Sequence, residues 1–468
     1  MRQPRWRRWA GMLIAGALFA TFVAPVPASA TFPTSAAAAG KPRLTDPQPC
    51  FTDFTCAQLT VPLDRSGRMS GTLRLRVAMG NNVTAPRGTL LFLTGGPGQP
   101  GAGLVPSISQ RVEYLLDDYR LVMIDQRGTG EGAIDCPRLQ VEAGASDITP
   151  PSPQAVRECA ALLGRTRHFY TTADTVADLE DLRRALDIPR WTIDGISYGA
   201  YVGTHYGLTY PKRVSRLVLD SVVPQDGLHA LYVASLHRTG SVLRKACQEQ
   251  GCSFDPATEL AEVVRRYGNG VGVFDLIVVA SILDPTLTGA NFFPVLELLH
   301  QAAQGNPDPL NQAIEELRSV GIQAPPEDFS SGLHVATLCA DLTDAPWGDS
   351  AAPLSGRDRA VDRALRKLHP SETWPFPPAT AIGHGVIQSC RHWPPARPNL
   401  PPPRPRLTMP VLLINGDRDL STPLEWAVEQ AAQTPRGKLV VIRGMGHSIQ
   451  GRNAEGDAVV SRFLLGHP

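Results

Sequence analysis

The sequence lacks an excess of charge of either sign. Of its 468 residues, 45 are Lys or Arg and 44 are Asp or Glu, so the formal net charge is +1. It contains no basic stripe and no acidic run, which gives no indication of a nucleic-acid partner or of a solvated tail. Aromatic residues are few, at 6%, but hydrophobic residues reach 43%, enough for a packed core. The length suits a core that carries a large insert.

The N-terminal apolar stretch, from about residue 11 to 23, is too short for a transmembrane helix, which needs roughly 20 apolar residues. Four arginines precede this stretch and Ala28-Ser29-Ala30 follows it, in the pattern of a cleaved export signal. We therefore predict a signal peptide over 1–30, a flexible leader over 31–47 and a secreted protein without stable membrane association. No cysteine follows the cleavage site, which argues against a lipid anchor.

The cysteines lack the C-x₂-C spacing of zinc sites, and the sequence predicts no metal. Their number, eight, is even, and in an exported chain an even number favours disulfides. Spacing alone leaves every pairing open. Proximity along the chain suggests Cys50–Cys56, Cys136–Cys159, Cys247–Cys252 and Cys339–Cys390.

Short apolar segments recur with the length of buried strands. One of them alternates along 73–79, and the others are continuous apolar runs over 89–93, 120–124, 190–194, 216–219, 411–414 and 438–442. Between two of these runs, apolar residues from Val176 to Leu186 recur on one face of a helix. Strands that alternate with helices predict an α/β fold with a mainly parallel sheet flanked by helices.

This alternation stops between about residues 226 and 400. Helical patterns and proline-rich loops fill the segment, with helices expected at 241–250, 258–267, 292–304, 309–318 and 357–367. We predict a core in two parts, 48–225 and 401–468, interrupted by a mostly helical cap over 226–400. The second part of the core carries the residues considered next.

Ser197 stands between two glycines, in Gly195-Ile196-Ser197-Tyr198-Gly199, where a predicted strand passes into a predicted helix. In a strand–turn–helix elbow the serine has a strained backbone, and small residues two positions away let strand and helix approach. Its hydroxyl is then exposed near the positive end of the helix. The pattern also occurs by chance in simple turns, and its place between strand and helix favours a nucleophile.

A serine hydroxyl needs a base, and in this fold an acid and then a histidine follow the serine along the chain. Asp417 and Asp419 follow the strand predicted at 411–414, and His447 follows the strand at 438–442. We predict that His447 accepts the proton of Ser197 and that Asp419 orients the imidazole. Asp417 is the competing acid, and each residue taken singly also fits an ordinary loop or turn.

The glycine-rich segment 94–101 directly follows the strand predicted at 89–93. In this fold such a loop supplies an oxyanion hole, because glycines let bare amides approach the substrate oxygen. We predict that the amides of Gly96 and Tyr198 form it. A flexible glycine turn is the alternative, but it does not explain why the loop lies at a strand end.

Four motifs together resemble the proline iminopeptidase and tripeptidyl aminopeptidase group of α/β-hydrolases. They are GGPG at 95–98, DQRG at 125–128, GISYG at 195–199, and the pair DRDLSTP and GMGHS at 417–423 and 444–448. The resemblance extends from about Cys50 to the C-terminus and is greatest to secreted tripeptidyl aminopeptidases. It implies an α/β-hydrolase fold with a cap, and it places the acid at Asp419. One departure is Thr94, where proline iminopeptidases usually have histidine.

The resemblance also implies that acidic side chains, partly from the cap, bind the free α-amine of the substrate. Asp341 and Glu327 are the candidates here, although each, taken singly, fits an ordinary solvated carboxylate better. Arg127 of DQRG is expected to order a loop by hydrogen bonding.

Together, these features lead us to expect a secreted serine exopeptidase, of tripeptidyl or prolyl type. It would hydrolyse peptide bonds near free N-termini through an acyl-enzyme, without a metal or an organic cofactor. A secreted carboxylesterase of the same fold is the alternative, since it would use the same acyl-enzyme route. A third possibility is a non-catalytic binding protein on a hydrolase fold. The sequence leaves open the length of the peptide removed and the side chains preferred.

Overall fold

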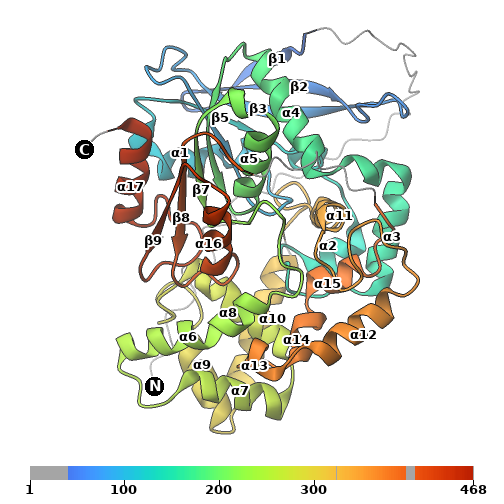
Figure 1. Cartoon of the computed structure of the whole chain (residues 1–468), viewed down its shortest axis with the longest axis vertical. Coiled ribbons are helices and arrows are strands. Elements are labelled where there is room, and N and C mark those ends of the chain that lie inside the picture. Colours follow the sequence, from blue (N-terminus) through green and yellow to red (C-terminus); the bar gives the residue numbers. More distant parts are fainter. Residues whose placement is uncertain (1–40, 323, 397–405, 467–468) are drawn as a thin grey trace, which may run out of the picture. The chain divides into compact units, whose positions relative to one another are not determined.

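The computed structural model describes residues 41–322, 324–396 and 406–466 (Figure 1). The predicted signal peptide lies outside these residues. Parts of three other predicted segments also lie outside them: residues 31–40 of the leader, 397–400 of the cap and 401–405 of the second part of the core. Residues 44–47 were predicted to belong to a flexible leader, but they begin a strand. Leu44 pairs with Leu59 there, so backbone pairing orders the end of the leader.

One nine-stranded sheet organises the fold, in the order β1-β2-β3-β5-β4-β6-β7-β8-β9. The strands are β1 (Leu44–Phe51), β2 (Phe54–Pro62), β3 (Thr72–Gly80), β4 (Thr89–Leu93), β5 (Arg120–Ile124), β6 (Trp191–Ile196), β7 (Val214–Asp220), β8 (Val411–Gly416) and β9 (Gly437–Ile442). The strands from β5 to β9 are parallel, and β1, β2 and β3 extend the sheet antiparallel to one another and to β5. All seven predicted strands are present, and the sequence analysis missed β1 and β2.

Two hydrophobic clusters cover the two faces of this sheet. In β4, Leu91 and Leu93 belong to one cluster, whereas Leu90 and Phe92 belong to the other. Neighbouring residues of a strand point to opposite faces, so both faces are buried at β4. This burial explains why the strand is a continuous apolar run rather than an alternating one.

The helices fall into two groups along the chain. Those outside the β7–β8 connection are α1 (Val105–Arg111), α2 (Pro137–Ala143), α3 (Pro153–Leu163), α4 (Thr172–Ala185), α5 (Tyr198–Thr209), α16 (Leu424–Ala432) and α17 (Ala454–Leu465). Those within it are α6 (Val233–Gln250), α7 (Pro256–Tyr267), α8 (Gly270–Leu283), α9 (Val295–Ala303), α10 (Asp308–Ile322), α11 (Ser331–Asp341), α12 (Arg357–Lys367), α13 (Pro370–Thr373), α14 (Pro378–Gly383) and α15 (Gly385–Cys390). We call this second group the cap helices. They include all five helices expected between 226 and 400.

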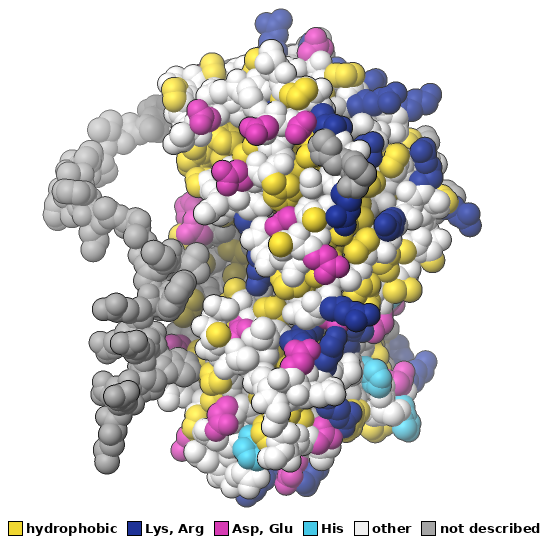
Figure 2. All heavy atoms as spheres, turned by 90° about the vertical axis from the view of Figure 1, so that its left-hand side faces the viewer, with side chains coloured by type: hydrophobic (Ala, Val, Ile, Leu, Met, Phe, Trp, Pro, Cys, Tyr) yellow, Lys and Arg dark blue, Asp and Glu magenta, His cyan; other side chains and the backbone are white. Residues whose placement is uncertain are grey.

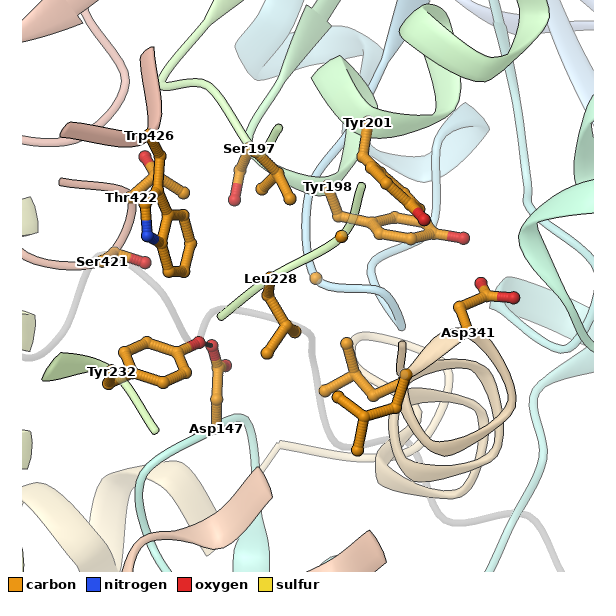
Figure 3. A pocket seen from close by; sticks show the side chains of 15 residues that line it. Asp147, Ser197, Tyr198, Tyr201, Leu228, Tyr232, Asp341, Ser421, Thr422 and Trp426 are labelled. Atoms are coloured by element: carbon orange, nitrogen blue, oxygen red, sulfur yellow. Dashed lines mark hydrogen bonds between the residues drawn. The ribbon is translucent and has the colours of Figure 1, made fainter. Parts of the chain in front are cut away.

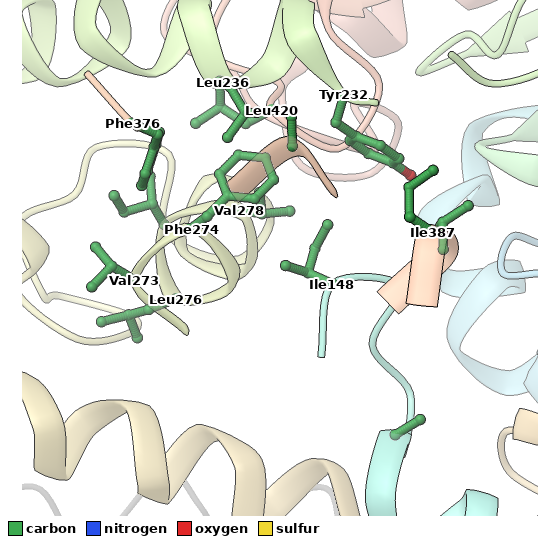
Figure 4. Close-up of a cluster of buried hydrophobic side chains, with 14 of the residues drawn as sticks. Ile148, Tyr232, Leu236, Val273, Phe274, Leu276, Val278, Phe376, Ile387 and Leu420 are labelled. Atoms are coloured by element: carbon green, nitrogen blue, oxygen red, sulfur yellow. The ribbon is translucent and has the colours of Figure 1, made fainter. Parts of the chain in front are cut away.

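The cap helices have a hydrophobic core of their own. Figure 1 shows most of them gathered at one end of the sheet, and Figure 4 shows part of their core around Phe274 and Phe376. Ile148, from the loop between α2 and α3, and Leu420, from the loop after β8, belong to the same cluster. The cap thus packs against the loop that carries Asp419, which lies next to Leu420.

The four disulfides suggested by proximity are all present: Cys50–Cys56, Cys136–Cys159, Cys247–Cys252 and Cys339–Cys390. No cysteine is left free. The last pair joins α11 to α15 within the cap. In the ranges that the structure covers, every helix is too short or too polar to cross a bilayer, and acidic and basic side chains share the face seen in Figure 2.

Candidate active site

Ser197 occupies a sharp turn between β6 and α5. Its φ is 59° and its ψ is −124°, a conformation that costs free energy for a residue with a side chain. The amide of Ser197 donates to the carbonyl oxygen of Asp220 at 2.9 Å, which holds the turn in place. A Cβ on Gly199 would lie 2.2 Å from the carbonyl oxygen of Leu93. Only glycine therefore lets α5 approach β4 this closely.

The side chain of Ser197 lies in a pocket of about 570 Å³ of empty volume between the sheet and the cap. Figure 3 shows its hydroxyl pointing into this pocket. The pocket is lined by Gly96, Asp147, Ser197, Tyr198, Tyr201, Val223, Gly227, Leu228, Tyr232, Leu338, Asp341, Leu342, Ser421, Thr422 and Trp426. Loops at the carboxyl ends of the parallel strands supply the catalytic side of this pocket, where ligands bind in such sheets.

The structure brings Asp419 and His447 together. Nδ1 of His447 lies 2.9 Å from Oδ2 of Asp419. Asp419 is fully buried, and its Oδ1 accepts the amides of Ser421 and Thr422, each at 2.9 Å. Because a carboxylate oxygen accepts, Nδ1 of the imidazole donates to Asp419, which leaves Nε2 as the nitrogen that can accept a proton.

His447 is buried, with 7% of its surface exposed. Burial alone lowers the pKa of an imidazole, but the charge of Asp419 and its hydrogen bond outweigh burial and raise the pKa above its ordinary value. The neighbouring carboxylate thus stabilises the positive charge that the imidazole acquires when it accepts a proton.

Ser197 and His447 are not hydrogen-bonded to each other. Among the described residues, the hydroxyl of Ser197 has no hydrogen-bond partner, and Nε2 of His447 has none either. The structure therefore brings together two of the three predicted triad members, and it places the third in the adjoining pocket. In the absence of substrate, catalytic hydrogen bonds are often long and tighten only in the complex.

Asp417, the competing acid, has other partners. Its Oδ2 pairs with Lys245 of the cap helix α6, and its Oδ1 accepts the amide of Gly444 at 2.7 Å. These contacts tie the loop after β8 to the cap and to the loop after β9. Asp417 makes no contact with His447, so the geometry favours Asp419 as the acid.

Asp220, at the end of β7, was not among the residues predicted from the sequence. Its carboxylate accepts the amide of Ile449 at 2.9 Å and that of Gln450 at 3.1 Å, and the next residue, Ser221, accepts the amide of Ser448 at 2.7 Å. Since its carbonyl also holds the turn of Ser197, Asp220 fixes the loop of the nucleophile and the loop of His447 to one strand end. The signal in the sequence was an acidic residue that closes an apolar strand.

The loop predicted to form the oxyanion hole runs against Ser197. A Cβ on Gly95 would lie 3.1 Å from Cβ of Ser197. Gly96 has a φ of +103°, which favours glycine, and its amide donates to no group in the part of the chain described. The amide of Tyr198, at the start of α5, has no partner within its helix. Gly96 and Tyr198 both line the pocket.

The cap holds this loop from the other side. Nδ1 of His334, in α11, donates to the carbonyl oxygen of Pro97 at 2.7 Å. The amide of Ser330 donates to the carbonyl of Gly98 at 3.0 Å. Thr94, where proline iminopeptidases usually have histidine, donates its hydroxyl to the carbonyl of Pro100 at 3.3 Å. Support for the loop therefore comes from α11 as well as from the loop itself.

Asp341 and Glu327, the two candidates for binding the substrate amine, lie in different surroundings. Asp341 lines the pocket, and its Oδ2 accepts the amide of Thr172 at 3.0 Å, but its Oδ1 is buried without a partner. Burial raises the pKa of Asp341 to about 7, against the hydrogen bonds from Thr172. Glu327 is exposed and is not part of the pocket lining, so it does not fit the role we considered for it.

Arg127 lies away from the pocket, as expected. It is fully buried and makes two hydrogen bonds of 2.7 Å to Asp178, and it donates to the carbonyl of Phe169 at 2.6 Å. It thus orders the loop after β5. Within the part of the chain described, no group of three or more His, Cys, Asp or Glu side chains could hold a metal ion.

Comparisons with known proteins agree with this architecture. A family model described as the alpha/beta hydrolase fold matches residues 88–263, and one described as TAP-like protein matches residues 378–466. The tripeptidyl aminopeptidase of Streptomyces lividans is 28% identical over 439 residues, which cover 85% of this chain and 78% of the relative. Serine protease Hip1 of Mycobacterium tuberculosis is 24% identical over 469 residues, or 88% of this chain and 85% of the relative.

Two further likenesses are more limited. The proline iminopeptidase of Neisseria meningitidis is 34% identical over 133 residues, which cover 28% of this chain and 32% of the relative. A solved esterase from Thermogutta terrifontis superposes with a TM-score of 0.40 at 18% identity, over 87% of this chain and 98% of the esterase.

The sheet topology and the family models make this chain an α/β hydrolase. More particularly, it is a serine hydrolase that resembles the tripeptidyl aminopeptidases and proline iminopeptidases. The resemblance carried by the four sequence motifs is thereby confirmed.

Proposed function

We propose that the chain is a secreted aminopeptidase that releases short peptides from free N-termini, with Ser197, His447 and Asp419 as its catalytic triad. The observation that carries the proposal is the pocket itself. It contains the hydroxyl of Ser197 and an unpaired carboxylate oxygen of Asp341, and it adjoins the hydrogen-bonded pair of Asp419 and His447.

In the first step, the oxygen of Ser197 attacks the carbonyl carbon of the scissile bond while its proton passes to Nε2 of His447. The amides of Gly96 and Tyr198 donate to the oxygen that becomes negative. The tetrahedral intermediate then collapses, the imidazolium gives its proton to the leaving amine, and the acyl group stays on Ser197. Water, deprotonated by His447, hydrolyses this ester and restores the serine hydroxyl. This sequence requires Ser197 to come within hydrogen-bonding reach of His447 in the substrate complex.

Asp341 supports a requirement for a free amino group. A buried carboxylate oxygen without a partner is costly, and a substrate ammonium group would satisfy it with a charge-assisted hydrogen bond. An acetylated N-terminus carries no charge and would leave Asp341 unpaired. The cap also encloses the pocket with apolar side chains such as Leu338 and Leu342, which favours a short chain end over the middle of a long chain.

Secretion is supported by the predicted signal peptide and by the four disulfides. Disulfides persist in oxidising compartments and are rare in the cytosol of ordinary organisms. Mass spectrometry of the protein recovered from the culture medium tests this, and we expect a mature N-terminus close to residue 31. Intact protein retained inside cells would contradict secretion.

The activity is tested with chromogenic mono-, di- and tripeptide amides, each with a free and with an acetylated N-terminus, beside short acyl esters. We expect turnover of free peptide amides, much slower turnover of the acetylated forms, and none with Ser197→Ala. Equal rates on free and acetylated peptides would refute the aminopeptidase assignment. Turnover of esters alone would favour the carboxylesterase alternative.

A further inference from the structure

The pocket contains a second carboxylate, Asp147, that the mechanism above does not use. It lies in the loop between α2 and α3, and its Oδ2 accepts the hydroxyl of Tyr232 at 3.2 Å. Figure 3 shows Asp147 beside Tyr232 and below Ser421, whereas Asp341 enters from the opposite side, with Leu228 between the two carboxylates in this view. The pocket thus has an acidic side chain at each of two walls.

Asp147 lacks a Lys or Arg partner. Among the described residues, neither cation forms an ion pair with it, and the histidine beside it is His334, whose Nε2 lies 3.7 Å from Oδ1. Nδ1 of His334 donates to the carbonyl of Pro97, and the distance from its Nε2 to Asp147 is too long for a hydrogen bond. Nε2 is in fact a buried atom without a hydrogen-bond partner. A carboxylate in these surroundings favours a cation supplied by the ligand.

The two carboxylates act on different ends of the site. Burial lowers the pKa of His447 and Asp419 raises it, and the charge of Asp147 adds to the rise. Burial raises the pKa of Tyr201 far above its ordinary value, and the charge of Asp341 adds to that rise. Figure 3 shows Asp147 on the side of Ser421 and Thr422, and the hydroxyl of Thr422 lies 3.2 Å from Nδ1 of His447, whose imidazole protonates the leaving amine. Asp341 lies on the side of Tyr198 and Tyr201 of α5.

We propose that Asp147 forms a subsite for a positively charged side chain on the leaving side of the scissile bond. A Lys or Arg at the first position of the leaving peptide has the charge and the length for such a contact. This inference rests on the proposed function, because it assigns the α-amine of the substrate to Asp341. Trp426 lines both this pocket and an adjoining groove, which gives the rest of the leaving peptide a path out of the site.

The test uses free peptides that are identical except at the first residue of the leaving part, which is Lys, norleucine or Glu. Cleavage is followed by mass spectrometry. We expect kcat/KM for the Lys peptide to exceed that for the norleucine peptide by about tenfold or more, because one charge-assisted hydrogen bond accounts for a preference of this size. The Asp147→Asn variant should bring this ratio close to one. Glu327→Gln, which removes an exposed carboxylate outside the pocket, should leave the ratio unchanged.

A ratio near one in the wild type, or a ratio that survives Asp147→Asn, would overturn the subsite. If Asp147→Asn instead slows every free peptide alike and Asp341→Asn does not, Asp147 holds the α-amine and our placement is wrong. Should Asp147→Asn fail to fold, the Lys preference of the wild type must still weaken as salt is raised, and Asp147→Glu must retain it. A wild-type enzyme that cleaves no peptide amide refutes the proposed function, and the subsite with it, whereas cleavage without a Lys preference refutes the subsite alone.

Discussion

Replacing Asp419 and Asp417, one at a time, by asparagine tests which of the two carboxylates orients His447. In Asp419→Asn the amide oxygen can keep accepting the backbone amides of Ser421 and Thr422, so the loop should hold its shape. The amide NH₂ then faces Nδ1 of His447, where the carboxylate oxygen lay at 2.9 Å. Because two donors cannot bond to each other, the imidazole must move its proton to Nε2. That nitrogen can then no longer accept the proton of Ser197.

The wrong tautomer should lower kcat by about 10³- to 10⁴-fold, which is about 4 to 5.5 kcal/mol of activation free energy. In Asp417→Asn, the amide oxygen can still accept the amide of Gly444, and the pair lost with Lys245 is partly exposed and worth about 0–1 kcal/mol. We expect its kcat to stay within about threefold of the wild type, since only this weak pair is lost. Both variants are assayed on a free tripeptide amide, with unfolding temperatures as the control. A large loss in Asp417→Asn, with little loss in Asp419→Asn, would refute the assignment of the acid.

Three further predictions concern the pocket. Because Asp419 raises the pKa of His447, kcat should fall on acidification through a pH above the ordinary imidazole value of about 6.5, and a kcat unchanged down to pH 5 would exclude a histidine base. Burial raises the pKa of Asp341 to about 7, and Asp341 must be ionised to bind ammonium, so KM for free peptides should rise as pH falls below 7. Asp341→Asn should raise KM at least tenfold for free peptides but not for acetylated peptides. His334→Leu removes the hydrogen bond to Pro97 and should lower kcat about tenfold with KM little changed. His334→Asn should restore part of the lost kcat. Thr337→Val, which removes another hydrogen bond of α11, should leave kcat unchanged. Equal losses in all three α11 variants would mean that His334 is only structural.

Much of the sheet could be predicted from the sequence, because parallel strands buried on both faces are continuous apolar runs. The segments at β4 and β8 are of this kind. β1 and β2 were missed, although β3 in the same antiparallel part of the sheet was predicted. The residues of β1, Leu44–Phe51, are mostly exposed and include two prolines, so neither hydrophobicity nor propensity marks them as a strand. Backbone pairing with β2 makes this segment a strand.

In the candidate site, the residues that belong to a clear sequence motif could be predicted from the sequence. The residues that hold them in place could not. Asp419 and His447 follow strands within motifs, and they are hydrogen-bonded to each other as expected. Asp220 and His334 carry no motif of their own. Their roles depend on amides and carbonyls brought near by the fold from distant parts of the chain. Glu327 looked equivalent to Asp341 in the sequence, because burial is what separates the two carboxylates.

The central claim is that Ser197 is a nucleophile activated by His447. It is tested most directly by incubating the protein with a fluorophosphonate probe and mapping the adduct by mass spectrometry. We predict a single stoichiometric adduct on Ser197, lost in Ser197→Ala and formed far more slowly in His447→Ala. A folded wild-type protein that forms no adduct, or one that is labelled at the same rate without the imidazole, would contradict the account.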